Sequence, residues 1–347
     1  HDRERRRQAV DLAFSTYAKL FVDGHLKTAW KDWEIGDRLL TAEAVPVLKA
    51  KALPAIKRSD IAAVLDRMND RPAAARLAHA TLRKLFKWAV GRGDLERSPM
   101  DGMKAPAGVA ARDRVLSDHE LALVWRGAGT LGYPFAPLFQ LLIVTGQRRE
   151  EVSGLAWGEL DRASATWSLP ANRAKNGQAH IVPLSPVAME VLDNLAKSLA
   201  GCADEDAAAE PVEWPRKGLV FTTTGKTPVS GYSKGKTRLD AAIVAVAAED
   251  AAAAGASPEG VAGWRVHDLR RTMATGFQRL GVRFEVTEAV LNHVSGAKSG
   301  VAGVYQRHDW KEEKRTALEA WGRHVASSLN PAAVTGNVIE LEGRRAA

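Results

Sequence analysis

The stretch from Trp264 to Trp310 constrains this chain most, because it gathers side chains that suit one kind of chemistry. It begins with W-R-V-H-D-L-R-R-T and ends with L-N-H followed by G-V-Y-Q-R-H-D-W. Residues three apart share one face of a helix, so His267 and Arg270 can point at the same group. Arginine matches a phosphate, histidine moves a proton near neutral pH, and tyrosine can form a covalent intermediate. Together with His293 and Tyr305, this pattern indicates phosphoryl transfer.

The charge of the chain favours an anionic partner. The formal net charge is +8 and the isoelectric point is near 9.6. Residues 1–104 hold 21 Lys and Arg against 14 Asp and Glu, an excess of +7, whereas the remainder holds 28 against 27. A basic excess that gathers in one part of a chain favours nucleic acid.

Composition also excludes several classes of protein. The single Cys202 excludes an internal disulfide and a cysteine-based zinc site. No apolar run approaches the roughly 18–20 residues of a membrane span, and no signal peptide is visible. We therefore expect a cytoplasmic protein with no membrane partner. Because the chain starts at His1, we also expect that a preceding segment has been removed.

Residues 1–104 are expected to form a helical DNA-binding domain. An amphipathic helix is predicted over residues 1–23, and its lead-in H-D-R-E-R-R-R is either a solvated end or a DNA-contacting arm. The helical pattern continues over residues 26–52, with Trp30 and Trp33 in the core. Ser59 is expected to cap the next helix, which the sequence Arg71-Pro72 ends.

The clearest helix of this first domain is predicted over residues 74–90. Its apolar stripe consists of Leu82, Leu85, Phe86 and Ala89. Much of the remainder is basic, through Arg76, Arg83, Lys84 and Lys87. A basic face opposite a core face suits a helix laid on DNA phosphates, and it also suits an ordinary solvated face.

Residues 105–113 read as a linker, residues 114–330 as a second domain, and residues 331–347 as a flexible tail. Ser117 and Glu120 fit a capping box at the start of a helix. A buried helix is predicted over residues 135–144.

Two short strands are predicted over residues 166–169 and 180–184, and a third over residues 219–221. The segment A-N-R-A-K-N-G-Q lies between the first two, and Asn-Gly is typical of a hairpin turn. Lys175 is therefore expected at a hairpin tip.

The remaining segments are less regular. Residues 200–217 read as a surface insertion and residues 222–238 as a loop, followed by an Ala-rich helix to about residue 254. A last amphipathic helix is expected over residues 309–329. Its apolar positions are Trp310, Leu318, Trp321 and Val325.

In chain order, T-G-x-R-x-x-E at residues 145–151 is followed by Lys175, by His267-x-x-Arg270, by His293 and by Tyr305. This order resembles the tyrosine recombinase (phage integrase) family over roughly residues 114–325. The last motifs are similar to integrases of phages and genomic islands. The resemblance implies a mainly α fold: a helical core-binding (SAM-like) domain, and an α+β catalytic domain with a small antiparallel sheet. It also implies a C-shaped clamp around duplex DNA.

The resemblance assigns a phosphate-binding role to several residues. Arg148 and Arg270 would clamp the scissile phosphate and stabilise charge on its non-bridging oxygens. His293 would donate a hydrogen bond to a phosphate oxygen, and Glu151 would orient the surroundings of Arg148. Read without the resemblance, the arginines could be ion-pairing residues and His293 a capped or core histidine.

The resemblance also assigns the nucleophile and the proton transfers. Tyr305 would attack phosphorus and form a 3′-phosphotyrosine, and His267 would be the base or assisting group. Lys175 would protonate the leaving 5′-oxygen, because a lysine carries a proton at neutral pH. Otherwise Lys175 could be an ordinary turn lysine, His267 a capped or core histidine and Tyr305 a half-buried tyrosine, with Tyr232 the rival nucleophile. These groups suffice without a metal or a cofactor.

The family reading implies a site-specific recombinase that integrates or excises a mobile element. Its expected partners are double-stranded DNA attachment sites, three further protomers on DNA, and accessory DNA-bending or directionality proteins. The protein would be monomeric when free and associated with the bacterial nucleoid when bound. The last helix, with Trp310 and Trp321, would contact another protomer or pack within its own domain.

Two alternatives remain beside this reading. One is a type IB topoisomerase-like enzyme that nicks and reseals DNA, and the other is a catalytically silent DNA-binding regulator. An RNA-binding protein is disfavoured, because no aromatic-rich strand platform is visible.

One departure from the family pattern stands out: the sequence before the nucleophile reads Leu291-Asn292-His293, where Leu-Gly-His is usual. Asn tolerates a left-handed backbone, so the change is expected to be mild. Further DNA contacts are expected from Arg83, Lys84, Lys87, Arg173, Lys234 and Lys236.

Overall fold

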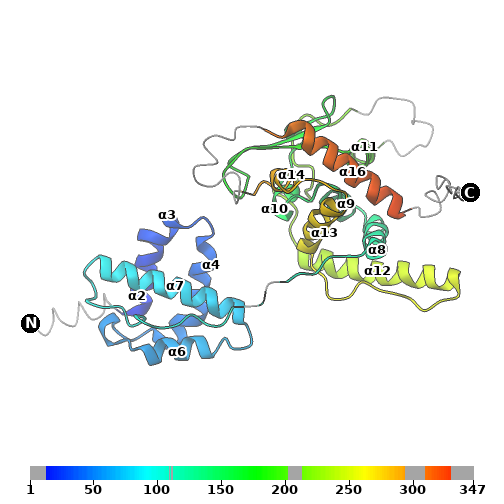
Figure 1. Ribbon diagram of the computed structural model, residues 1–347. Helices are drawn as coiled ribbons and strands as arrows, with labels where there is room; N and C mark the ends of the chain where they lie inside the picture. The colour runs from blue at the N-terminus through cyan, green and yellow to red at the C-terminus, as the bar shows by residue number, and fades with distance from the viewer. Residues whose placement is uncertain (1–12, 109, 111, 202–212, 294–308, 330–347) are drawn as a thin grey trace, which may run out of the picture. The chain divides into compact units, whose positions relative to one another are not determined.

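The computed structural model divides the chain into two compact units, His1–Arg112 and Asp113–Ala347 (Figure 1). It describes residues 13–108, 110, 112–201, 213–293 and 309–329. The division falls at the end of the segment that we expected to be the linker. The basic lead-in before residue 13, most of the acidic stretch after Cys202, and Tyr305 lie outside the described residues.

The first unit is a bundle of helices around one apolar core. Its helical segments are α2 (Phe14–Phe21), η1 (Val22–Leu26), α3 (Lys27–Ala29), α4 (Trp33–Leu39), η2 (Leu40–Ala44), α5 (Val45–Leu48), η3 (Leu53–Ala55), α6 (Arg58–Asp66) and α7 (Pro72–Gly91). The predicted helical region after residue 26 is thus interrupted near Trp30, whose backbone is extended. Trp30 and Trp33 are partly buried and pack against the core.

The longest helix of this unit, α7, matches its predicted pattern. Pro72 fits the first turn of a helix, where its missing N–H costs no hydrogen bond. The predicted apolar stripe is buried, and the basic residues of the other face are exposed. The buried residues are Leu82, Leu85, Phe86 and Ala89.

The prediction that Ser59 caps α6 is wrong. The helix begins one residue earlier, at Arg58, with Lys57 in the N-cap position. The side chain of Asp60 reaches back and its Oδ2 accepts from the backbone N of Lys57 at 2.9 Å. An acidic residue in the first turn therefore satisfies this helix end in place of a serine.

The second unit surrounds a central buried helix, α9 (Phe135–Thr145), with helices and a small sheet. Helices α8, α10, α11, α13 and α16 all contact α9, and α12 packs on α8. Their bounds are α8 (Asp118–Gly129), α10 (Arg149–Ser153), α11 (Pro186–Leu199), α12 (Tyr232–Ala254), α13 (Val266–Arg279), α14 (Phe284–Val290) and α16 (Lys311–Leu329), and a 3-10 turn, η4, spans Trp157–Glu159. The predicted mainly α fold with a small antiparallel sheet is confirmed.

The capping box at the start of α8 is confirmed. Ser117 Oγ accepts from the backbone N of Glu120 at 3.1 Å, and Glu120 Oε2 accepts from the backbone N of Ser117 at 2.9 Å. The two residues thus satisfy each other's exposed N–H groups, as the motif requires.

The antiparallel sheet has the order β1-β2-β3, with β1 at Leu160–Asp161, β2 at Thr166–Leu169 and β3 at His180–Pro183. Both predicted hairpin strands are present, and Trp167 pairs with Val182. The third strand was wrongly predicted. Leu219 makes only an isolated bridge to Ala156, because the chain beyond Ala156 turns into the 3-10 segment η4 and the pairing ends there.

Helix α12 begins at Tyr232, so the prediction of a loop as far as residue 238 is wrong. Gly231, with a φ of +80°, ends the loop directly before the helix. Gly235 lies so close to Phe135 that an added Cβ would meet its ring at 2.6 Å. This contact with the first residue of α9 is one that the local composition of the Gly-, Ser- and Lys-rich segment does not reveal.

Trp321 packs inside its own unit, which is one of the two arrangements that we expected for the last helix. Its side chain is 1% exposed, and Nε1 donates to the carbonyl of Ile143 at 2.8 Å. The ring also meets Phe277 edge-on, with the centroids 6.5 Å apart. Trp310 precedes α16 with a φ of +56°, and the guanidinium of Arg283 lies 5.2 Å from its ring.

None of the helices in the described ranges combines the length and the hydrophobicity that crossing a membrane requires.

Candidate active site

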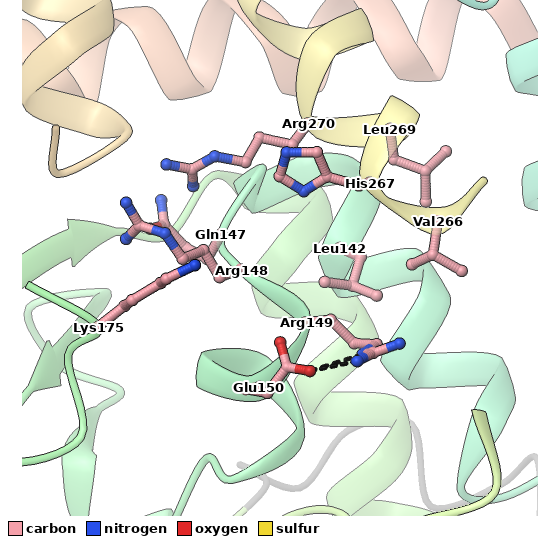
Figure 2. A pocket seen from close by; sticks show the side chains of 10 residues that line it. All are labelled: Leu142, Gln147, Arg148, Arg149, Glu150, Lys175, Val266, His267, Leu269 and Arg270. Atoms are coloured by element: carbon pink, nitrogen blue, oxygen red, sulfur yellow. Dashed lines mark hydrogen bonds and ion pairs between the residues drawn. The ribbon is translucent and has the colours of Figure 1, made fainter. Parts of the chain in front are cut away.

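A cavity of about 250 Å³ opens between the start of α10, the loop from β2 to β3, and the start of α13 (Figure 2). Side chains from these three segments, which are far apart in the sequence, converge on it. Its lining consists of Leu142, Gln147, Arg148, Arg149, Glu150, Lys175, Val266, His267, Leu269 and Arg270. Four of the six predicted catalytic residues therefore lie around one hollow.

The turn after α9 brings the first arginine to this cavity. Gly146 ends α9 in a left-handed conformation, with a φ of +59°. A Cβ at this position would lie 2.1 Å from Cε of Met273, so the turn packs directly against α13. The sharp change of direction places Gln147 and Arg148 at the wall of the cavity.

Arg148 is held by the buried carboxylate of Glu151, which is 2% exposed. Glu151 Oε1 lies 3.1 Å from Arg148 Nη1, and Oε2 accepts from the backbone N of Arg148 at 3.2 Å. The same Oε1 accepts from the backbone N of Lys175 at 3.2 Å. One carboxylate thus connects the arginine of α10 to the loop that carries the lysine.

Arg270 is almost completely buried, with 5% of its surface exposed. Its Nη1 donates to the carbonyl of Gly146 at 2.7 Å, and its Nη2 donates to the carbonyl of Leu291. Burial, with the nearby charge of Arg148 as a second cause, lowers the pKa of Arg270 to about 10. The guanidinium therefore keeps its charge at neutral pH in a fixed position.

His267 lies in the first turn of α13, one helical turn before Arg270 (Figure 2). Desolvation lowers its pKa, and the positive charges of Arg270 and Arg271 lower it further. The imidazole is therefore neutral at neutral pH, which is the state that can accept a proton.

Lys175 is exposed and lies on the loop formed by residues 170–179, with its side chain directed toward the cavity (Figure 2). The hairpin prediction placed it in this loop. The connection is longer than the two-residue turn that Asn-Gly typically forms, although Gly177 has the positive φ of +71° that such a signal predicts.

His293 lies just after α14 and contacts Arg270 rather than lining the cavity itself. Its Nε2 is 3.1 Å from Nη2 of Arg270, and its Nδ1 is 2.8 Å from Oε1 of Glu288. In a neutral ring, Nδ1 donates to the carboxylate and Nε2 accepts from the guanidinium.

Two predicted DNA contacts are engaged inside the protein. Arg173 forms an ion pair with Glu159 at 2.5 Å and donates to the carbonyl of Glu151 at 3.3 Å. Lys236 pairs with Asp240 at 2.6 Å and lies 4.0 Å from the ring of Trp264. Both side chains thus have partners within their own unit, and their contact with DNA stays a prediction. The other four candidates, Arg83, Lys84, Lys87 and Lys234, are exposed.

Several residues of the site escaped the sequence prediction. Glu288 orients His293, and Gln147 donates to the carbonyl of Val290 at 2.9 Å. Asn176 and Asn292 join the lysine loop to the turn before His293. Asn292 had a signal in the sequence as a departure from the family pattern, and Asn176 had one only as part of the Asn-Gly turn. The φ of +47° at Asn292 confirms the left-handed backbone that we expected there.

The rival nucleophile Tyr232 is the first residue of α12, and the guanidinium of Arg149 stacks over its ring at 4.3 Å.

In the described part of the chain, no group of three or more His, Cys, Asp and Glu side chains is arranged to hold a metal ion.

Comparison with known proteins yields one family. The sequence pattern of the Phage integrase family matches residues 125–309, just over half of the chain. Prophage integrase IntF of Escherichia coli K12 is 30% identical over 138 residues, which cover 37% of this chain and 29% of the relative. Prophage integrase IntA of the same organism is 27% identical over 203 residues, which cover 58% and 40%. The chain spans less than half the length of either relative.

The fold also matches a solved structure, a lambda integrase tetramer bound to a Holliday junction. The TM-score is 0.60 at 18% identity, and the match covers 82% of this chain and 79% of the other. At this identity the likeness shows a shared fold.

Proposed function

Because this chain belongs to the phage integrase family, we propose that it is a site-specific DNA recombinase that cuts and rejoins DNA through a phosphotyrosine intermediate. One observation carries the proposal: Arg148, Lys175 and the pair His267 and Arg270 reach a single cavity from three separate segments. Phosphoryl transfer by this route uses two permanent cations, a neutral imidazole and an ammonium group. A structural ion-pair network has no need to bring these four groups to one cavity.

The arginines provide the site for the scissile phosphate. Arg270 is fixed by two backbone carbonyls and Arg148 by Glu151, so neither guanidinium has to reorganise when charge develops on the non-bridging oxygens. His293 approaches the same phosphate from beside Arg270 and, in its charged form, donates to one oxygen.

In the cleavage step, the Tyr305 oxygen forms a bond to phosphorus as the bond from phosphorus to the 5′-oxygen breaks. The phenolic proton passes to His267, and Lys175 gives a proton to the departing 5′-oxygen. The products are a 3′-phosphotyrosine and a free 5′-hydroxyl. Rejoining runs the same transfers in reverse with the 5′-hydroxyl of a second strand.

The substrate of this reaction is double-stranded DNA at attachment sites, and four protomers act on two such sites. Lambda integrase, which shares this fold, forms a tetramer on a Holliday junction. We assign the exposed basic face of α7 to the DNA backbone, because lysine and arginine side chains bind phosphates. Such contacts position the protein on the duplex but do not recognise a particular DNA sequence. The free protein is a monomer. When bound to DNA it is associated with the nucleoid, and accessory proteins set the direction of integration or excision.

Covalent trapping tests this proposal. Repeated selection from a pool of random duplexes supplies the binding site, which is then placed in a duplex with a nick near the cleavage position. Loss of the short 5′-hydroxyl fragment leaves the protein attached to DNA, and a denaturing gel shows the adduct. The expected result is an adduct with the parent and with Tyr232→Phe, and none with Tyr305→Phe.

The other outcomes contradict the proposal in different ways. An adduct that survives Tyr305→Phe and disappears in Tyr232→Phe assigns the nucleophile to α12. Tight binding without any adduct favours a catalytically silent regulator. An adduct with relaxation of a single plasmid, but without exchange between two sites, favours a topoisomerase-like enzyme.

A further inference from the structure

Two asparagines tie the loop of Lys175 to the turn that precedes His293. Asn176 Nδ2 donates to the backbone carbonyl of Asn292 at 2.9 Å. In return, Asn292 Nδ2 donates to Asn176 Oδ1 at 3.3 Å and to the carbonyl of Gln178 at 3.4 Å. The three hydrogen bonds run between segments that are 116 and 114 residues apart in the sequence.

The conformation of Asn292 indicates that its side chain is more than a substitute for glycine. Its φ of +47° lies in the left-handed region, which glycine adopts without strain and asparagine adopts at some cost. The residue is 4% exposed, so its amide is removed from water and relies on protein partners. The bonds to the lysine loop supply those partners.

The same carbonyl also reaches the phosphate-binding part of the site. Arg148 Nη2 lies 3.5 Å from the carbonyl oxygen of Asn292, which already accepts from Asn176. On its other side, Lys175 is held through its backbone N by Glu151, which also binds Arg148. The attachments at the consecutive residues Lys175 and Asn176 therefore both lead to Arg148.

We infer that Asn176 and Asn292 are positioning residues that hold the Lys175 loop so that its ammonium group meets the leaving 5′-oxygen. The inference rests on the proposed function and adds to it two residues without a chemical role of their own. An exposed loop samples many backbone conformations unless it is fixed, and displacement by about 1 Å can slow an enzymatic step about 100-fold.

The leaving group of the DNA provides a selective test. Lys175 is needed because the departing oxygen must take up a proton, whereas a sulfur atom at the same bridging position leaves as a thiolate without one. Single-turnover cleavage is measured on a normal duplex and on a duplex with a 5′-bridging sulfur. The variants are Asn292→Gly, which keeps the left-handed backbone, Asn176→Ala, Lys175→Ala and, as a matched control on the same loop, Asn172→Ala.

The expected result is a rate about 10- to 100-fold below the parent on the oxygen duplex for Asn292→Gly and Asn176→Ala. On the sulfur duplex both should come within about twofold of the parent, as should Lys175→Ala. Asn172, which is exposed, should behave as the parent on both duplexes when changed to Ala. The double variant of Asn176 and Asn292 should be no slower than the worse single variant, because both changes break one connection.

Three results overturn the inference and leave the proposed function in place. Equal slowing on the two duplexes means that the asparagines support the fold in general rather than the acid. Parent rates in both variants mean that the loop needs no such attachment. If the sulfur duplex does not restore the rate of Lys175→Ala, Lys175 is not the acid that protonates the leaving group. A parent that cleaves neither duplex overturns the proposed function instead, and with it the inference.

Discussion

The imidazole of His293 is paired with the carboxylate of Glu288, with Nδ1 and Oε1 2.8 Å apart across the end of α14. The carboxylate accepts only, so it fixes a proton on Nδ1 and leaves Nε2 facing Arg270. The ring is thereby oriented before any DNA arrives.

Glu288→Gln should therefore slow cleavage, because it removes the carboxylate that accepts from Nδ1 and orients the ring of His293. We expect a loss of roughly 10-fold, in the range for a hydrogen bond to a charged group. Single-turnover cleavage measures it, with Glu285→Gln, an exposed residue of the same helix, as the control. If the change slows a His293→Ala background equally, Glu288 does not act through His293.

The acidic limb of the pH–rate profile should lie below the ordinary imidazole pKa of about 6.5. The pKa of His267 is lowered, so the base stays neutral and active until the pH falls through that lowered value. Arg271→Gln removes one of the charges that lower it and should move the limb to higher pH. Arg279→Gln, at the far end of α13, should leave the limb in place. If Arg271→Gln leaves the acidic limb unchanged, the limb reports the titration of a group other than His267.

Substitutions at Lys87 and Arg173 should have different effects, one on DNA binding and the other on stability. Neutralising exposed Lys87 by substitution with Ala should lower the salt dependence of DNA binding by about one unit of slope. Arg173→Ala should leave that slope unchanged and destabilise the second unit, because Glu159 loses its ion pair and keeps only the hydrogen bond from Trp167. Binding titrations at several salt concentrations, beside thermal melts, distinguish the two. A smaller slope in Arg173→Ala would return that residue to the DNA interface.

Ser117→Ala should lower the free energy of unfolding of the second unit by about 1 kcal/mol, because the N–H of Glu120 loses its acceptor. Urea unfolding measures the difference. Ser233→Ala, on the surface of α12, serves as the control and should stay within about 0.5 kcal/mol of the parent. Equal effects at the two serines would mean that the cap contributes nothing specific.

Gly276→Ala should destabilise the second unit by about 1–3 kcal/mol through overpacking. The added Cβ would lie 2.2 Å from Cζ3 of Trp321, whose buried ring has no room to retreat. In the control Gly129→Ala, the new Cβ would meet only Gln140, at 3.8 Å. Matching melting temperatures for the two variants would show that the core around Trp321 yields easily.

Local signals in the sequence predicted the elements that local interactions determine. The capping box at Ser117, the apolar stripe of α7 and the two strands around Lys175 depend on residues a few positions apart, and all are present. The start of α12 was missed because the local composition does not reveal the contact of Gly235 with Phe135, about a hundred residues earlier in the chain. The third strand was misplaced for a similar reason, since pairing at Leu219 is limited by the path of a distant segment.

The candidate site was likewise predicted in part, where local motifs identify its residues, and missed where distant contacts decide. The motif order singled out the residues that carry charge or protons, and the cavity gathers Arg148, Lys175, His267 and Arg270. The residues that hold them could not be predicted, because an asparagine or a glutamate has the same local pattern whether it is exposed or aimed at a partner. Trp321 shows the same limit: an apolar helix position fits an interface and a core equally well, and the structure buries it in the core of its own unit.

The turn at Gly146 limits how this protein can change over generations. Any other residue there meets two separate obstacles, the left-handed backbone and the side chain of Met273. Shortening Met273 would remove the second obstacle and leave the first, which among the other residues asparagine meets at the lowest cost. The carbonyl of Gly146 also fixes Arg270, so a substitution at this residue would displace the guanidinium that lines the cavity. A saturation library at position 146 should therefore return glycine alone among its active members.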